Sequence, residues 1–80
     1  MRLDKFLKVS RLIKRRTVAN DACDSAHVSV NGRPAKASYD VKVDDVIEIK
    51  FGERTTKLKV LDVRDFTAKA DAASMYEFIS

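Results

Sequence analysis

The hydrophobic period of this 80-residue chain changes from helical to alternating at about Val28. Before that point, apolar and polar side chains separate on a helical wheel, which predicts an amphipathic helix over residues 3 to about 10. Its apolar face consists of Leu3, Phe6, Leu7 and Ser10. A chain this short encloses one apolar core. We therefore expect residues 1–80 to form a single α+β domain, in which two packed N-terminal helices cover a small, mostly antiparallel sheet.

A second helix is expected directly after the first. Thr17 is the predicted N-cap, which places Asn20 and Asp21 in the first helical turn. The predicted packing face carries small side chains, namely Val18, Ala19, Ala22, Cys23 and Ala26. Small side chains allow the second helix to lie close against its neighbour.

The alternating part of the chain predicts strands at residues 28–30, 46–51 and 56–63. Asn31-Gly32 is the strongest short-range signal of a tight hairpin turn, because both central positions need a positive φ. Pro34 confines the returning strand to an edge of the sheet. The last predicted strand pair is joined through Gly52-Glu53-Arg54, and residues 68–80 are expected to form a short helix followed by a short strand.

The positive charge is concentrated at one end of the chain. The net charge is +4, but residues 1–16 carry +6 and the remaining residues carry −2. Such segregation is typical of a surface that binds a polyanion. The cluster Arg11, Lys14, Arg15 and Arg16 precedes the second helix, whose free N–H groups also favour anions. Arginine matches two phosphate oxygens and stacks on bases, so nucleic-acid binding is the favoured interpretation.

Two other polyanions are weighed against RNA. A membrane surface is disfavoured because the large apolar residues of the first helix are needed for the core. DNA attracts cations equally well, but residues 18–26 offer mainly Ala, Val, Cys and acidic residues, which counts against reading of the major groove. No apolar run reaches the roughly 18 residues of a membrane span, and no secretory signal is recognisable, so the expected location is the cytoplasm.

Little in the sequence indicates catalysis or a cofactor. His27 is interpreted as a capping or packing residue, Cys23 as a buried packing residue, and Asp44-Asp45 as part of a turn. One thiol and one histidine do not make a four-ligand zinc site. The aromatic residues Tyr39, Phe51, Phe66, Tyr76 and Phe78 are interpreted as core or half-buried, with base stacking as the alternative if they are exposed. We expect no catalytic residues, no metal and no cofactor.

The motifs "RLDKFLKVSRLIKRRTVA", "VSVNG", "AKAS" and "DDVIEI", in this order and spacing, resemble the S4 domain, the small RNA-binding domain first described in the fourth protein of the small ribosomal subunit. The resemblance covers essentially the whole chain and implies the αL-type S4 fold. It also implies an RNA-binding surface made of Arg2, Lys5, Lys8, Arg11, Lys14, Arg15, Arg16 and Thr17. Two positions depart from the family pattern: Ala26 replaces a glycine found in many members, and Asp44-Asp45 replaces Gly-Asp.

Within this superfamily, the opening residues together with "AASMY" resemble the stand-alone RqcP family of Gram-positive bacteria. That resemblance implies a monomeric factor of ribosome-associated quality control. Its partners would be an obstructed large ribosomal subunit, large-subunit rRNA, peptidyl-tRNA held in the P site, and RqcH, which extends the stalled chain with alanines. Two alternatives stay open: a heat-shock-type protein that rescues large subunits, and the RNA-binding domain of an RNA-modifying enzyme. The enzyme is disfavoured because the chain holds no catalytic part.

Overall fold

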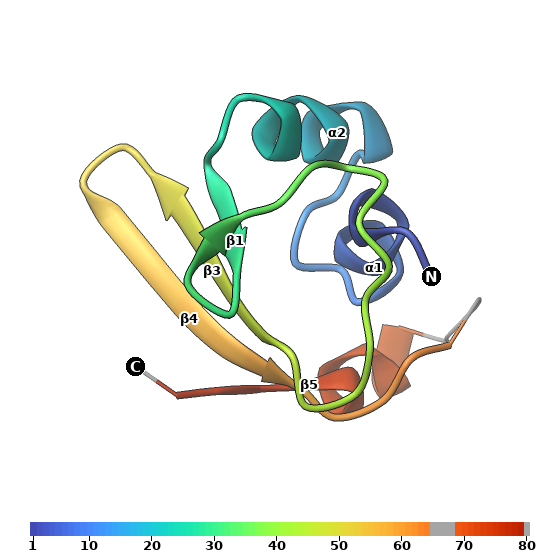
Figure 1. Ribbon diagram of the computed structural model, residues 1–80. Coiled ribbons are helices and arrows are strands. Elements are labelled where there is room, and N and C mark those ends of the chain that lie inside the picture. Colours follow the sequence, from blue (N-terminus) through green and yellow to red (C-terminus); the bar gives the residue numbers. More distant parts are fainter. Residues whose placement is uncertain (65–68, 80) are drawn as a thin grey trace.

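The structure is a computed structural model that describes residues 1–64 and 69–79 (Figure 1). Two helices come first, α1 (Leu3–Val9) and α2 (Arg16–Asp24). The elements that follow are β1 (Val28–Val30), β2 (Arg33–Pro34), β3 (Val46–Phe51), β4 (Arg54–Val60), the 3-10 helix η1 (Lys69–Met75) and β5 (Tyr76–Phe78). The predicted fold class, with two helices followed by a small sheet, is confirmed.

The strands form one antiparallel sheet in the order β2-β1-β3-β4-β5. Pro34 lies in the edge strand β2, as predicted, because proline has no N–H to donate to a further strand. Asn31 and Gly32 form the tight turn between β1 and β2 with φ angles of 54° and 83°. Figure 1 shows α1 and α2 side by side, with the sheet on one side of them.

The core lies between the helices and one face of the sheet. Its largest fully buried apolar side chains are Phe6, Leu3, Leu7, Ile47, Leu58, Met75, Val28 and Val60. The predicted apolar face of the first helix is therefore confirmed, including Ser10, whose hydroxyl donates a hydrogen bond to the carbonyl of Leu7. Inward residues alternate with more exposed ones along β3 and β4, as expected for a sheet covered on one face.

The start of the second helix differs from the prediction. Thr17 is not the N-cap: α2 begins at Arg16, and Arg15 occupies the cap position without a side-chain hydrogen bond. Asn20 and Asp21 therefore follow the first turn. The earlier start places Arg16 and Asn20 four residues apart on one face of α2, where both side chains reach Asp4 of α1. This tertiary contact accompanies a helix start that lacks a capping side chain.

The small-residue face of α2 is narrower than predicted. Ala19, Ala22 and Cys23 are buried, but Val18 is 46% exposed, and Ala26 is exposed and lies beyond the helix end. Ala26 has φ 62°. The His27 amide donates to the carbonyl of Ala22, and the Ala26 amide donates to that of Cys23, which is the Schellman arrangement. Position 26, where the S4 resemblance implies a glycine in many members, thus takes the left-handed backbone with an alanine.

The second half of the sheet also shows a boundary shift. The strand predicted at residues 56–63 is β4, Arg54–Val60, because the turn at Gly52 (φ 58°) is tight enough to pair Arg54 directly with Phe51. It ends at Val60 because the next amide, that of Leu61, donates to Met75 and the chain turns toward η1. The expected C-terminal order of a short helix and a short strand is confirmed by η1 and β5.

The Asp44-Asp45 pair forms a turn, as predicted. Asp44 has φ 76°, so it takes the left-handed conformation that glycine adopts more easily. The Asp45 carboxylate accepts hydrogen bonds from the Lys42 amide, the Tyr39 hydroxyl and the Asn31 side chain. These contacts fix the approach to β3. They give the Asp45 carboxylate a role in the turn.

Candidate nucleic-acid interface

The eight residues predicted to bind RNA lie along α1, the α1–α2 connection and the start of α2. Arg2 is the N-cap of α1, Lys5 and Lys8 lie on α1, and Arg16 and Thr17 begin α2. All eight are exposed except Lys5, which is partly buried. Their order along the chain is Arg2, Lys5, Lys8, Arg11, Lys14, Arg15, Arg16 and Thr17. The helical pair therefore presents seven cations and Thr17 along one stretch of the chain, and all but Lys5 are exposed.

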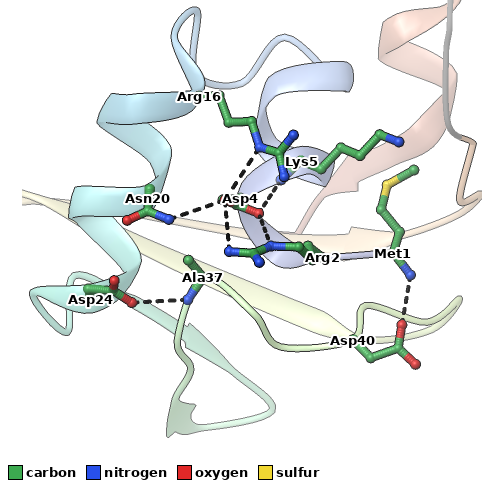
Figure 2. Close-up of polar contacts among 9 residues, drawn as sticks. All are labelled: Met1, Arg2, Asp4, Lys5, Arg16, Asn20, Asp24, Ala37 and Asp40. Atoms are coloured by element: carbon green, nitrogen blue, oxygen red, sulfur yellow. Dashed lines mark hydrogen bonds and ion pairs between the residues drawn. The ribbon is translucent and has the colours of Figure 1, made fainter.

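A buried carboxylate brings two of these cations together (Figure 2). Asp4 is only 2% exposed. Arg2 donates from Nε to Asp4 Oδ1 at 3.1 Å and from an Nη atom to Oδ2 at 3.4 Å, and Arg16 Nε lies 3.4 Å from Oδ2. The Asn20 amide donates to Oδ2 at 3.3 Å, and the Lys5 backbone amide donates to Oδ1 at 2.8 Å. Asp4 thus orients guanidinium groups from α2 and from the start of α1.

The ionisation of Asp4 follows from this geometry. Burial by itself raises the pKa of the Asp4 carboxyl, but hydrogen bonds from Arg2, Asn20 and the Lys5 amide, together with the Arg16 charge, outweigh it. The pKa is held below its ordinary value of 3.8, so the carboxylate is charged at neutral pH. One carboxylate neutralises only part of the charge of two half-exposed arginines. The surface therefore stays positive while its arginines are held in place.

The backbone on either side of Arg2 is fixed by the segment after β2. Arg2 forms an isolated antiparallel bridge with Asp40. The Leu3 amide donates to Tyr39 at 2.8 Å, and the Val41 amide donates to Met1 at 2.8 Å. The Met1 ammonium group lies 2.7 Å from Oδ1 of Asp40 and lowers the pKa of that carboxyl. This contact is drawn in Figure 2. The backbone of Arg2 is therefore already ordered, so no backbone conformational entropy is lost there when the side chain binds a ligand.

An open depression lies between the two helices. Its lining residues are Arg2, Asp4, Arg16, Thr17, Asn20 and Asp21. It adjoins the first turn of α2, which has no side-chain cap, so the amides there that lack an intrahelical partner are available to an anion. Among the described residues, Arg16 contacts Asp4 through its Nε atom alone. The depression thus combines arginine N–H groups with a helix start.

Four predicted cations lie away from this cluster. Lys8, Arg11, Lys14 and Arg15 make no ion pair with any residue in 1–64 or 69–79. Arg11 follows the C-cap of α1 with φ 63°, and its amide donates to the carbonyl of Lys8. These side chains extend the positive surface along the α1–α2 connection.

Sequence reasoning missed two members of the cluster, Asp4 and Asn20. Asp4 follows Leu3 and precedes Leu7 by one helical turn, so it lies beside the apolar stripe of α1. That position was the available signal that its carboxylate is buried. Asn20 gave no signal of its own, because its contact with Asp4 depends on how α2 packs on α1.

The remaining candidate residues are a cysteine and five aromatic residues. Cys23 is 2% exposed, and burial together with the charges of Asp4 and Asp24 raises the pKa of its thiol to about 11, which confirms a packing role. The interpretation of the aromatic residues is wrong for two of them: Phe51 is 49% exposed and Phe78 is 58% exposed. Tyr39 and Tyr76 are half-buried, as predicted, and Phe66 lies outside the described residues.

Among the described residues, neither a metal-binding cluster nor a membrane-spanning helix is found. No group of three or more His, Cys, Asp or Glu side chains within residues 1–64 and 69–79 is arranged to hold a metal ion. Across the same residues, no helix has the length and apolar character that a bilayer span requires.

Comparison with known proteins identifies the family. Residues 1–47 match the S4 domain. The chain is 58% identical over 80 residues to the RQC P-site tRNA stabilizing factor of Streptococcus pneumoniae, covering 100% of this chain and 91% of that protein. It is 51% identical over 79 residues to the factor of the same name from Bacillus subtilis, covering 99% and 92%.

A solved structure agrees with the fold. Heat Shock Protein 15 of Vibrio cholerae, described as trimeric, superposes with a TM-score of 0.91 at 26% identity, over 100% of this chain and 82% of that one. The S4-like architecture predicted from the sequence is therefore confirmed. The chain belongs to the S4 domain family and, within it, to the RQC P-site tRNA stabilizing factors.

Proposed function

We propose that the helical pair is an RNA-binding surface on which Arg2, Lys5, Lys8, Arg11, Lys14, Arg15, Arg16 and Thr17 contact phosphates. The observation that carries this proposal is the placement of Arg2 and Arg16 on one buried carboxylate. Two guanidinium groups held at a fixed separation, beside a helix start without a cap, suit the phosphates of a folded RNA backbone. Residues 1–80 act in this proposal as one domain.

The biological role follows from the relatives. We infer that this chain is a non-catalytic, cytoplasmic factor of ribosome-associated quality control. As a monomer it binds an obstructed large ribosomal subunit, contacts large-subunit rRNA and peptidyl-tRNA, and stabilises that tRNA in the P site. It thereby supports the extension of the stalled chain with alanines by RqcH. The names of relatives 58% and 51% identical to the chain support the P-site tRNA part of this role.

A heat-shock-type rescue of large subunits is the second candidate, and the superposition on Heat Shock Protein 15 favours it. The lower identity to that protein, 26% compared with 58%, makes it the weaker of the two. The two roles differ in their outcome, because only the first promotes alanine tailing. The RNA-binding domain of a modifying enzyme has no observation in its favour here.

Sedimentation tests the proposal. The purified chain is centrifuged through sucrose with large subunits that carry peptidyl-tRNA, with empty large subunits, and with intact ribosomes. We expect co-migration chiefly with the tRNA-bearing subunits, and a gain in alanine-tailed product when RqcH and alanyl-tRNA are added. Lys50→Ala is a suitable control, since Lys50 is an exposed cation of β3 and is not one of the eight predicted RNA-binding residues. Equal recovery from all three particles would contradict the P-site role.

A further inference from the structure

A groove between the α1–α2 connection and the sheet is lined by Phe51 and Phe78, the two exposed phenylalanines among the described residues. Its lining residues are Leu12, Ile49, Phe51, Thr56 and Phe78. Phe51 is 49% exposed and Phe78 is 58% exposed, whereas Ile49 is 4% exposed. The groove therefore has a buried apolar residue in its lining and two accessible aromatic rings.

The strand register explains why these rings share one face. Phe51 lies two residues after Ile49 and four after Ile47 on β3, so all three side chains point to the core face of the sheet. Phe78 pairs directly with the buried Leu58, which puts it on the same face. The exposure of both rings shows that this part of the face is not covered by the rest of the described chain. Leu12, from the α1–α2 connection, lines the groove beside the rings.

Among the described residues, none that lines the groove is acidic. Leu12 stands in the chain between Arg11 and Lys14, so the groove continues the proposed RNA-binding surface. Arg54 pairs with Phe51 across the hairpin and belongs to the same face, and it has no ion-pair partner among residues 1–64 and 69–79. An apolar slot with a cationic border is complementary to a nucleic-acid base attached to its phosphates.

We propose that this groove binds one unpaired base of the RNA, stacked against Phe51 and Phe78. This inference rests on the proposed RNA-binding function. The groove volume is about 250 Å³, below the roughly 300–1,000 Å³ of pockets for drug-sized ligands, so it suits a single planar ring. A second protein copy is a poorer occupant. A stable interface buries roughly 800 Å² per partner, a large share of the 5147 Å² surface of the described chain, and five lining residues do not supply it.

Two RNAs of nearly equal charge test the stacking. The first is a hairpin with one bulged 2-aminopurine, and the second is the same hairpin fully paired. We expect the chain to quench 2-aminopurine emission and to bind the bulged RNA more tightly. Phe51→Ala and Phe78→Ala should each weaken binding of the bulged RNA by about 5- to 150-fold and abolish the quench, while binding of the paired RNA is unchanged. Leu61→Ala, at an exposed leucine outside the groove, should change neither the quench nor the affinity for the bulged RNA.

Further variants separate the possible outcomes. Phe51→Leu keeps apolar bulk but removes the ring, so it should lose the quench while the circular dichroism and thermal midpoint stay those of the wild type. Arg16→Ala should weaken binding of both RNAs. If the wild type binds both RNAs equally, in a salt-dependent way and without a quench, the groove inference fails and the RNA-binding surface stands. If neither RNA binds, both proposals fail. A change in sedimentation-equilibrium mass on Phe51→Ala would assign the groove to self-association instead.

Discussion

The helical pair and the outer face of the sheet handle their charges differently. On the sheet, Lys57 Nζ lies 4.0 Å from Glu48 Oε2, and Lys59 Nζ lies 3.5 Å from Asp44 Oδ1. Each of these two lysines therefore has a carboxylate of its own. On the helices, Arg2 and Arg16 share the single carboxylate of Asp4. These two pairs on the sheet leave no excess charge, whereas two arginines that share one carboxylate do. The distribution of charge between these regions therefore says more about function than the net charge of +4.

The salt dependence of RNA binding should give the largest effect. Neutralising about four to six phosphates gives a log–log slope near −3 to −5, so affinity should fall by about 60- to 1,000-fold between 50 and 200 mM salt. Binding of an RNA hairpin followed by fluorescence anisotropy measures this slope. If the comparison is right, Lys50→Ala leaves the slope unchanged and Lys14→Ala makes it less steep by about one. A slope near zero would contradict the proposal that the chain binds RNA phosphates.

Loss of either clustered arginine should have the next largest effect. Arg2→Ala and Arg16→Ala should each weaken RNA binding by about 1–3 kcal/mol, because a charge-assisted contact is lost. Competition binding against the wild type measures it. Lys57→Ala removes a charge from one of the pairs on the sheet and should change affinity by less than about 0.5 kcal/mol. Equal losses from the two regions would break the comparison.

Asp4 should make stability depend on acid pH. Its folded pKa lies below the unfolded value near 3.8, so its contribution is present above that value and is lost as pH falls through the folded pKa. At pH 7, Asp4→Asn should lower the free energy of unfolding by about 1–3 kcal/mol, and the difference from the wild type should shrink toward pH 2. Urea unfolding at several pH values measures this. Asp21→Asn, at an exposed acid on α2, is the control; identical pH profiles for wild type and Asp4→Asn would contradict the assignment.

The smallest effect should come from the end of α2. Ala26 has φ 62°, a conformation that costs an L-residue roughly 1–2 kcal/mol. Ala26→Gly should therefore stabilise the chain by about 0.5–1 kcal/mol after the greater unfolded-state entropy of glycine is counted. Differential scanning calorimetry should show a rise of roughly 2–8 °C in the thermal midpoint, with RNA affinity unchanged. Ala22→Gly, within the helix, should destabilise instead.

Local patterns predicted much of the fold. The apolar stripe of α1, the Asn31-Gly32 turn and the strand at Val46–Phe51 were all readable, because each depends on neighbours in sequence. The start of α2 was not readable. The N-cap preference of Thr17 was overridden by the contacts that Arg16 and Asn20 make with Asp4, which lies more than ten residues away in the chain.

The sequence by itself determined where the positive charge lies along the chain, because charge and hydrophobic period are properties of neighbouring residues. The tertiary structure decided which charges act together. Asp4 is buried where α1 packs against α2, and there its carboxylate holds two arginines. The packing likewise decided that Phe51 and Phe78 remain exposed, since strand alternation assigns a face but not how far the helices extend over it.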